Sequence, residues 1–491
     1  MRPYRTRRQL KENYRHPGID HPDEVGITIA TTIVIESQGA DLKITEFYTK
    51  NRRSELGMIL IVTVIFYLAY FLAFFGRYSN STSIPLIIPT LMAVTPFLIH
   101  LANVAFAPNS DSTFMPIVAL LNEIGYVMIW RLNLHEASLQ VLWTYIGVVL
   151  YALTLFFIDR SAILERFRFL LAVAGLAMLV LPLVPGIGES INGARLWIHL
   201  GAYTFQPVEI SKLLLAIFFA SYFVEKNDVI GGVRGRQSIR DTLNPRILGP
   251  LLTAWLGSIL IMLMERDVGF SLMLFLVFII TIWLTTARLR YLIGGIVLFV
   301  GGALLANHLF GQVNERLVTW LDPWKYANTI GYQIVQAQYA LGAGGVSGTG
   351  LGLGHPTLIP VVSSDFIFAA VGEEMGLAGT SAMVIAFVLL VGVGLRTALR
   401  AKNDFTALVA TIFTTMLGLQ AFFIMGGVVR LIPLTGVTLP FVAYGGSSLV
   451  SSYILVAVIM RISDEGSVED SDVKANRIRF RSHSLISSQS R

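Results

Sequence analysis

Two apolar runs, ILGPLLTAWLGSILIMLM at residues 247–264 and VGFSLMLFLVFIITIWL at residues 268–284, are separated by only three charged residues, Glu265, Arg266 and Asp267. Each run is long enough to cross the hydrocarbon core of a bilayer, which takes about 17–25 apolar residues. The three charges then lie at a membrane surface, where a carboxylate is costly unless it faces water or a partner. Asp267 is therefore a candidate functional residue. A short polar turn between two helices is the structural alternative, and position alone does not separate the two.

The rest of the chain has the composition of a membrane protein with many spans. Hydrophobic residues make up 54% of its 491 residues and charged residues only 14%, which excludes an ordinary water-soluble domain. The predicted fold class is an all-α polytopic membrane protein. Twelve segments are long and apolar enough to cross a bilayer: Leu56–Phe75, Ile84–Phe106, Phe114–Trp130, Leu139–Phe157, Phe167–Val184, Pro207–Val224, Ile247–Met264, Val268–Leu284, Tyr291–Leu309, Phe366–Leu395, Phe405–Gly427 and Phe441–Met460.

The distribution of basic residues predicts the orientation. Short loops rich in Arg and Lys stay in the cytoplasm, and with twelve spans the basic loops and both tails fall on one side. We therefore expect a multi-pass plasma-membrane protein with cytoplasmic N- and C-termini. The segment Phe114–Trp130 is the weakest span, because it contains Asn122 and Glu123, and a re-entrant helix is its alternative. Without it as a span, the basic N-terminus would lie outside.

The chain divides into four regions. Residues 1–55 are polar with a basic start and are predicted to form a mostly disordered cytoplasmic extension. Residues 56–107 hold two spans, residues 114–461 hold the other ten with a long outer loop at 311–365, and residues 462–491 form a cytoplasmic tail whose Ser-rich end is also expected to be disordered. The outer loops are poor in cations and rich in Gly, Pro and aromatic residues, as expected of loops that form a site.

Charge and cysteine content exclude other classes. The net charge of +6 is concentrated in the cytoplasmic loops and tails, so it indicates attraction to anionic lipid and argues against binding to nucleic acid. The chain has no cysteine, which rules out disulfides, thiol catalysis and thiolate metal sites.

Two motifs at the predicted outer face combine charges with aromatic or apolar residues. Arg195 and Trp197 lie in the run N-G-A-R-L-W-I, where a cation and an amphipathic ring at headgroup depth form either an interfacial anchor or part of a site. Glu209 and Lys212 are three residues apart on one face of a predicted helix. They either neutralise each other or line a hydrated cavity shared with Asp267.

A glycine-dense stretch, Gly342–Gly354, lies in the long outer loop. It lacks the Gly-Lys-Ser/Thr ending of a phosphate loop, so nucleotide binding is not predicted. Its glycines either bring backbone N–H groups to a lipid diphosphate or provide positive φ angles in a flexible loop.

The tenth predicted span opens with several polar residues. Ser364 or Asp365 is placed to cap the helix, and Glu373 and Glu374 lie about two turns further on, at a depth where acidic side chains need partners. Lys212 is the candidate partner for one of them.

The last span is preceded by an irregular passage at residues 430–448, RLIPLTGVTLPFVAYGGSS. Irregular backbone at membrane depth is tolerated only where protein buries it or water reaches it. The passage is therefore predicted to form the wall of a cavity.

Taken together, these segments resemble the SEDS family of peptidoglycan glycosyltransferases, which includes RodA, FtsW and SpoVE. The resemblance covers residues 114–461 and implies a ten-span bundle, to which this chain adds two N-terminal spans. The added spans and the form Arg-Leu-Ile-Pro resemble family members from high-GC Gram-positive bacteria, and within the family the RodA-like branch is favoured. The matching runs, in family order, are Asn192-Gly-Ala-Arg-Leu-Trp-Ile, Gln206-Pro-Val-Glu, Asp267-Val-Gly, Leu321-Asp-Pro-Trp, Gly331-Tyr-Gln, Ser364-Asp-Phe-Ile-Phe-Ala with Gly372-Glu-Glu, and Ile432-Pro-Leu-Thr-Gly through Tyr444-Gly-Gly-Ser-Ser.

The chain departs from the family pattern in two of these regions. Glu265-Arg266 stands where the family usually has Gln-Pro, and Gly427-Val-Val-Arg430 replaces an Asn-Ile-Gly-Met type of run. These changes leave the roles of Arg266 and Arg430 open, whereas Asp267 stays in register.

The resemblance implies polymerisation of lipid II, a disaccharide-pentapeptide on undecaprenyl diphosphate, at the outer face of the plasma membrane, for elongation or division. The 4-hydroxyl of the acceptor sugar would attack the anomeric carbon of the growing chain with inversion, and Asp267 is the expected general base. The expected substrate-binding residues are Arg195, Trp197, Arg316, Gln333 and Ser447, and the expected cavity charges are Glu209, Lys212, Asp365, Glu373 and Glu374.

The resemblance also implies a partner, a single-span class B penicillin-binding protein. The developing charge on the diphosphate needs either basic side chains or a divalent cation such as Mg²⁺ or Mn²⁺, and no spacing of His or Asp identifies a metal site. Two other functions compete. A transporter that flips lipid II shares the many spans and broken helices, and a non-catalytic scaffold would use Asp267 only as a turn residue.

Overall fold

The computed structural model describes residues 51–78, 84–191, 194–201, 203–230, 245–265, 267–286 and 288–489. The chain forms two compact units, Met1–Asn51 and Arg52–Arg491, and the second holds almost all described residues. The expectation of disorder for the N-terminal extension falls on residues 1–50, outside the described residues. Its last residues, 51–55, are helical, because the first helix begins before its apolar run.

The described part of the chain is helical apart from one small sheet. In chain order the elements are the helix Asn51–Arg77, α2 (Ile87–Phe106), α3 (Phe114–Leu132), α4 (Leu134–Phe157), α5 (Ile163–Arg166), α6 (Arg168–Val180), η1 (Leu181–Leu183), β1 (Gly188–Ile191), β2 (Ala194–Leu200), β3 (Tyr203–Phe205), α7 (Val208–Ile230), α9 (Pro245–Met264), α10 (Val268–Thr286), α11 (Leu289–Leu309), α12 (Gly311–Leu321), η2 (Trp324–Tyr326), α13 (Tyr332–Gly344), η3 (Pro356–Leu358), α14 (Ile367–Leu399), α15 (Asp404–Val428) and α16 (Gly446–Gln489).

Each of the twelve predicted spans coincides with a helix, which confirms the all-α membrane fold. Among the described residues, nine helices are long and apolar enough to cross a membrane, and α6, α7 and α9 account for the other three expected spans. The doubtful span is the continuous 19-residue helix α3. It is weakly apolar because 78% of its apolar window is buried inside the protein, where polar side chains find protein partners.

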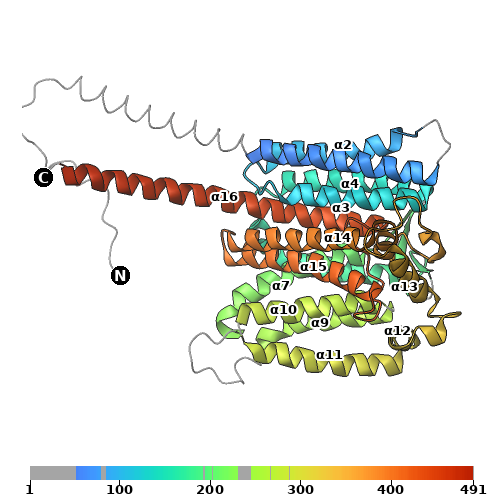
Figure 1. Cartoon of the computed structure of the whole chain (residues 1–491). Coiled ribbons are helices and arrows are strands. Elements are labelled where there is room, and N and C mark those ends of the chain that lie inside the picture. The colour runs from blue at the N-terminus through green and yellow to red at the C-terminus, as the bar shows by residue number, and fades with distance from the viewer. Residues whose placement is uncertain are drawn as a thin grey trace, which may run out of the picture. The chain divides into compact units, whose positions relative to one another are not determined.

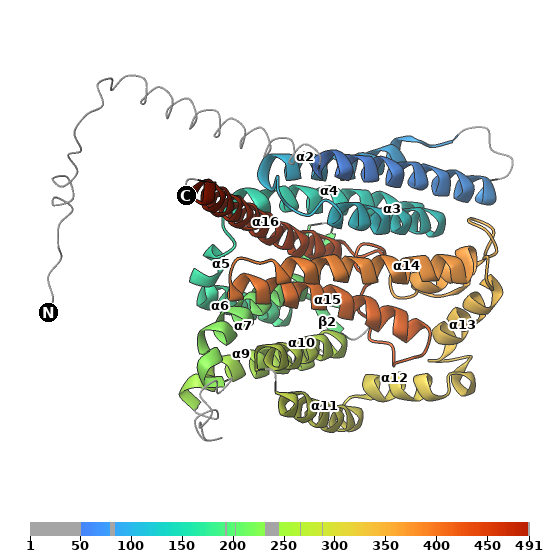
Figure 2. The ribbon, with the colours of Figure 1, turned by 60° about the vertical axis from the view of Figure 1, so that its left-hand side comes forward.

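The helices of the second unit run side by side in a bundle (Figure 1; Figure 2 shows the same bundle turned). Within it α16 packs along α4, α6 along α7, and α14 along α15. The membrane part of α16 is 89% buried, whereas only 6% of the corresponding window of α11 is buried. α16 is therefore a central helix, and α11 lies at the edge with its apolar side chains turned outward.

The loops between spans are structured at one end of the bundle. We call the end where α9 passes into α10 the site end; α12 and α13 lie there, at the right of Figure 1. The segment between α6 and α7, expected to be one of the structured outer loops but without a predicted strand, is an antiparallel sheet in the order β1-β2-β3. Its strands have only 4, 7 and 3 residues, too short for a strand pattern to stand out beside the apolar runs.

The C-terminal tail differs from the sequence expectation. Disorder was predicted for the Ser-rich end, but α16 continues as one helix to Gln489 and extends away from the bundle in Figure 1. The physical reason is local: after Gly466 the chain contains neither Gly nor Pro, the two residues that most weaken a helix.

Candidate functional site

The break between α9 and α10 holds Asp267 in a defined position. The Asp267 backbone N–H donates to the Met262 carbonyl at 2.8 Å, which closes the end of α9. One carboxylate oxygen, Oδ1, accepts the Phe270 backbone N–H at 3.0 Å and so satisfies a free donor at the start of α10. The alternative interpretation, that Asp267 belongs to a short polar turn between two helices, is thus partly correct. The other oxygen, Oδ2, is buried without a hydrogen-bond partner among the described residues, so its capacity to accept a hydrogen bond is unused.

Burial raises the pKa values of the two carboxyl groups at this break, Asp267 and Glu265. It raises the pKa of Asp267 to about 7, against the opposing effects of the Phe270 N–H and the positive charge of Arg316. The neighbouring Glu265 is also buried, and burial together with the Asp267 charge raises its pKa to about 9. Near neutral pH, Glu265 is therefore protonated and Asp267 is close to its midpoint.

Arg316 of α12 faces two carboxylates. Its Nη1 donates to the Thr435 carbonyl in the irregular passage at 2.9 Å, and its positive charge lowers the pKa values of both Asp267 and Asp365. Burial is the larger effect on Asp365 and leaves its pKa raised overall. α12, the α9–α10 break and the start of α14 thus meet around one guanidinium group.

Asp365 does not cap α14 as predicted. The residue at the N-cap position is Phe366, and no side chain caps the helix there. The Asp365 carboxylate is half-buried and is directed to the charge of Arg316 by the loop that precedes the helix. That loop is held by a hydrogen bond from the Tyr444 N–H to the Ser363 carbonyl at 2.8 Å.

Beside Asp267 lies a closed ion pair in α7. Lys212 Nζ is 2.6 Å from Glu209 Oε2, and both side chains are 1% exposed, which confirms the expected neutralisation. Ser451 of α16 donates to the same Glu209 oxygen at 2.7 Å. Lys212 Nζ also lies 5.3 Å from the centre of the Phe270 ring. The pair therefore contacts the residue that binds Asp267, from a position closed to the surface.

The predicted pairing of Lys212 with Glu374 is wrong. Glu374 Oε1 lies 2.9 Å from Nε of Arg131, at the end of α3, and its Oε2 accepts the Gly352 N–H at 2.9 Å. Glu373 Oε1 accepts the His355 N–H at 2.6 Å. Lys212 pairs with Glu209, one turn before it in α7, whereas Glu373 and Glu374 of α14 bind the glycine-dense loop.

This loop has the positive φ angles expected of its glycines, at Gly345, Gly348, Gly350 and Gly352. It is held in place by α14: the Thr349 and Gly350 N–H groups donate to the carbonyls of Glu373 and Glu374 at 2.9 and 3.0 Å. Because these N–H groups are already bonded to α14, they are not available to a diphosphate.

The expected substrate-binding residues occupy different parts of the site end. The Arg195 N–H on β2 donates to the Glu265 carbonyl at 3.2 Å, which joins the sheet to the break that carries Asp267. Trp197 is half-buried and pairs with Glu189 across the β1–β2 ladder. The Ser447 hydroxyl accepts the Gln206 N–H at 2.9 Å, so it joins the starts of α16 and α7. Gln333 is half-buried in the first turn of α13.

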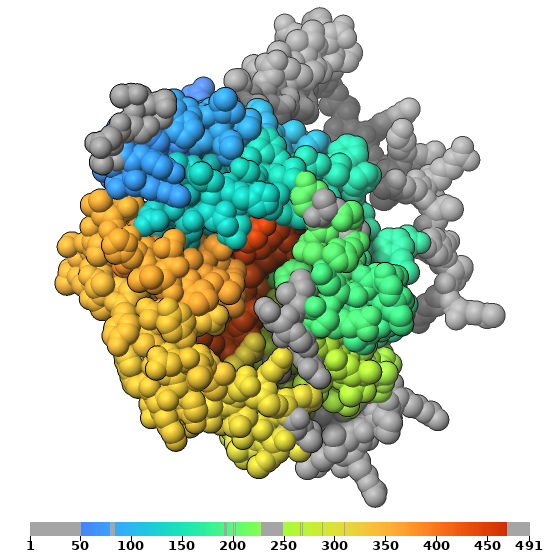
Figure 3. Space-filling view, turned by 90° about the vertical axis from the view of Figure 1, so that its right-hand side faces the viewer, coloured from blue at the N-terminus to red at the C-terminus, as the bar shows by residue number. Residues whose placement is uncertain are grey.

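The site end is hollowed at its centre. Figure 3 looks onto this end and shows a depression whose floor is the dark red start of α16, between orange and yellow residues of the long loop and the green residues around α7. The charges described above come from the elements around this depression. Within the described ranges, no group of three or more His, Asp or Glu side chains could hold a metal ion, so the divalent cation stays a prediction.

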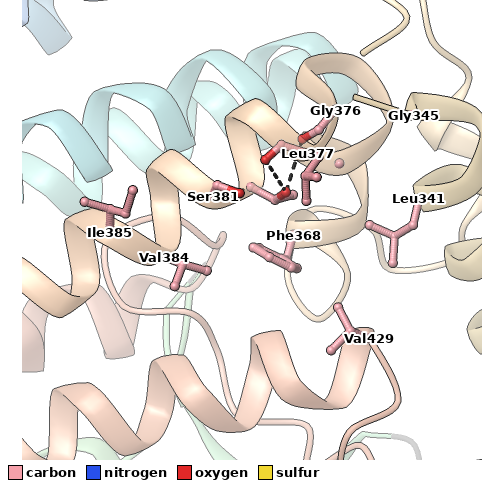
Figure 4. Close-up of a pocket in the computed structure, with 11 residues that line it drawn as sticks. Leu341, Gly345, Phe368, Gly376, Leu377, Ser381, Val384, Ile385 and Val429 are labelled. Carbon is pink, nitrogen blue, oxygen red and sulfur yellow. Dashed lines mark hydrogen bonds between the residues drawn. The ribbon is translucent and has the colours of Figure 1, made fainter. Parts of the chain in front are cut away.

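A separate cavity of about 430 Å³ lies where α14 is broken. At Gly376 the backbone has φ 64° and ψ −161°, which interrupts the helix. The N–H groups freed by the break donate to the carbonyls of Gly345 and Val346. Phe368, Leu377 and Val384 point into the cavity (Figure 4). Its lining is mainly apolar, so it suits hydrocarbon and not the chemistry of a sugar.

Two contributors to the site were missed from the sequence, Arg131 and Ser451. Arg131 ends a helix that is weakly apolar, which signals buried polar contacts but names no partner. Ser451 follows the Gly-Gly-Ser-Ser run, and no local pattern distinguishes it from its serine neighbours.

Comparisons with known proteins agree on one family. The family model FtsW/RodA/SpoVE, described as a cell cycle protein, matches residues 111–467. The peptidoglycan glycosyltransferase RodA of Mycobacterium tuberculosis (strain ATCC 25618 / H37Rv) is 42% identical over 376 residues, covering 74% of this chain and 80% of that protein. Stage V sporulation protein E of Bacillus subtilis (strain 168) is 32% identical, covering 72% and 97%.

A solved structure is also similar. A chain from a peptidoglycan synthase complex, described as coordinating polymerization and crosslinking, matches with a TM-score of 0.59 and 26% identity, covering 72% of this chain and 97% of that one.

Proposed function

Because the chain belongs to the FtsW/RodA/SpoVE family, we propose that it is a peptidoglycan glycosyltransferase that polymerises lipid II into glycan strands. The observation that carries the proposal is the position of Arg316, which faces the carboxylates of Asp267 and Asp365 at a hollowed end of a membrane bundle. A lipid-linked sugar needs a site that water and the bilayer both reach, and a hollow among broken helices meets that need.

The site end faces outward, and both termini are cytoplasmic. The support is the position of basic residues: Arg160 follows α4, Arg288 precedes α11 and Arg396 lies in the last turn of α14, and basic residues in and beside short loops stay in the cytoplasm. Lipid II would then reach the site from the outer leaflet.

In the reaction, a base takes the proton of the acceptor 4-hydroxyl while its oxygen forms a bond to the anomeric carbon of the growing chain. The bond from that carbon to the diphosphate breaks, and the lipid diphosphate leaves as an anion. This leaving group needs no acid, unlike that of a glycosidase, but its charge needs positive partners. Arg316 is the cation best placed to stabilise it.

Two carboxylates compete for the role of base. Asp267 has a pKa of about 7, which suits a base at neutral pH, but it is only 6% exposed and one oxygen is used by the Phe270 N–H. Asp365 is more exposed and is free of a capping role. We propose Asp267 as the base, because its pKa suits the task and its Oδ2 has no hydrogen-bond partner among the described residues, and we place Asp365 among the charges around the site.

The partner is a class B penicillin-binding protein, which would crosslink the strands made here. The similar chain in a peptidoglycan synthase complex supports such an assembly. The role in elongation or division depends on which partner is bound.

The test is polymerisation of lipid II by the purified protein with a candidate partner. Wild type is compared with Asp365→Asn, Asp267→Asn and a control, Asp159→Asn, which alters an exposed carboxylate at the opposite end of the bundle. All four are used at equal folded concentration.

We expect polymer from wild type and the control, and none from Asp267→Asn. Loss of polymer in Asp365→Asn alone would make Asp365 the base. Equal polymer from all four proteins would remove both carboxylates from the chemistry, and no polymer from any, with several partners tried, would favour a transporter of lipid II.

A further inference from the structure

The first helix of the bundle contacts the glycine-dense loop through backbone. A Cβ added at Gly76 would lie 2.2 Å from the Leu351 carbonyl oxygen, and one added at Gly352 would lie 2.5 Å from the Ala73 carbonyl oxygen. Side chains are excluded on both sides, so this contact requires glycine. The family model begins at residue 111, so the helix Asn51–Arg77 lies outside the part that defines the family.

The same helix ends on α3. Arg77 Nη1 donates to the carbonyls of Arg131 and Trp130 at 2.7 and 3.2 Å, two acceptors that the end of a helix leaves without intrahelical partners. The Tyr70 and Trp130 rings meet edge to face with centroids 4.8 Å apart. The end of α3 is therefore fixed by the first helix.

Arg131, at the end of α3, contacts both the glycine-dense loop and α14. Its Nη2 donates to the Gly354 carbonyl at 2.7 Å, and its Nε lies 2.9 Å from Glu374. Glu374 in turn binds the Gly352 N–H at 2.9 Å. Arg131 thus connects the end of α3 with the glycine-dense loop, through Gly354, and with α14, through Glu374.

The part of α14 held in this way leads directly to the site. It runs from Ile367 to the break at Gly376, and Asp365 is two residues before it. Because a helical segment this short moves as a unit, a shift of Glu373 and Glu374 with the loop would displace Asp365 relative to Arg316.

We propose that Gly76 and Arg77 are positioning residues for the transfer reaction. The first helix packs against the glycine-dense loop, and the loop fixes the position of the helical segment that begins two residues after Asp365. The inference rests on the proposed function for its kinetic part only. The contact itself has a readout that needs no substrate.

The experiment uses full-length Gly76→Ala and Arg77→Ala, with Gly57→Ala as the matched control on the same helix, where an added Cβ meets nothing within 4 Å. Hydrogen–deuterium exchange of peptides covering residues 345–358 is measured in detergent without substrate. Polymerisation kinetics are then measured with lipid II and the partner.

We expect Gly76→Ala and Arg77→Ala to speed exchange at residues 349–355 and to lower kcat about tenfold with little change in KM, because small displacements of a charged group at the site cost rate more than binding. Arg77→Lys, which keeps a donor, should recover part of kcat. Gly57→Ala should match wild type in every measurement.

The proposal is overturned if Gly76→Ala and Arg77→Ala exchange like Gly57→Ala, or if exchange rises while kcat does not change. If Gly76→Ala does not fold, Arg77→Ala and Arg77→Lys decide alone, since they change a half-buried side chain and not the backbone contact. An inactive wild type would contradict the proposed function, and the exchange comparison would still decide whether the first helix holds the loop.

Discussion

Trp320 and Arg430 exchange hydrogen bonds at the site end. Trp320 Nε1 donates to the Arg430 carbonyl at 3.0 Å, and Arg430 Nη2 donates to the Trp320 carbonyl at 2.9 Å. Arg430 has a φ of 61°, a conformation that costs a residue other than glycine about 1–3 kcal/mol. The exchange stabilises this conformation and fixes α12 against the irregular passage. Arg316 lies one turn before Trp320 on α12, so the pair also fixes the cation of the site.

Removing this exchange should reduce activity more than stability. Trp320→Phe keeps the ring but loses one donor, worth about 1 kcal/mol, and should lower kcat for lipid II polymerisation several-fold as Arg316 gains freedom. Trp324→Phe, at a ring that is 48% exposed, is the control and should retain full activity. Equal kcat for the two variants would show that the pair does not position Arg316.

A double-mutant cycle should detect the ion pair between Glu209 and Lys212 in α7. Lys212→Met leaves Glu209 buried without its cation and should destabilise the protein by about 3–5 kcal/mol, whereas Lys212→Met with Glu209→Gln should recover a large part of that loss. Thermal unfolding in detergent measures both. If the losses of stability from Lys212→Met and Glu209→Gln simply added in the double variant, the pairing would be contradicted. Glu374→Gln combined with Lys212→Met is the control, and there the two losses should add.

Asp267 should make stability depend on pH. Its pKa is raised from 3.8 to about 7 in the folded protein, so folding takes up a proton between these values and stability falls as pH rises through that window. Asp267→Asn removes the effect. The thermal midpoint of wild type should therefore drop relative to Asp267→Asn between about pH 4 and pH 7; parallel curves for the two proteins would mean that folding does not shift the pKa of this carboxylate.

Trp197→Ala should impair substrate placement more than folding. The ring is half-buried on β2, the central strand of the small sheet, so its loss leaves the helical core intact while removing an aromatic surface from the sheet. KM for lipid II should rise, with a thermal midpoint close to that of wild type. A midpoint much lower than that of wild type would assign Trp197 to the fold.

The spans could be located from local composition, because a bilayer requires about twenty consecutive apolar residues wherever a helix crosses it. The sequence also placed Asp267 at a helix junction and Glu209 beside Lys212, since contacts three residues apart follow from helix geometry alone. The small sheet and the helical tail were missed, because short strands and polar helices have weak local patterns.

Which distant groups meet depends on how the helices pack. The charge of Arg316 on α12 acts on both Asp267 and Asp365, and Arg131 rather than Lys212 pairs with Glu374 because α3 ends beside the glycine-dense loop. Charge complementarity would have allowed either pairing. The choice was made by the packing of helices separated by up to hundreds of residues, which no local pattern records.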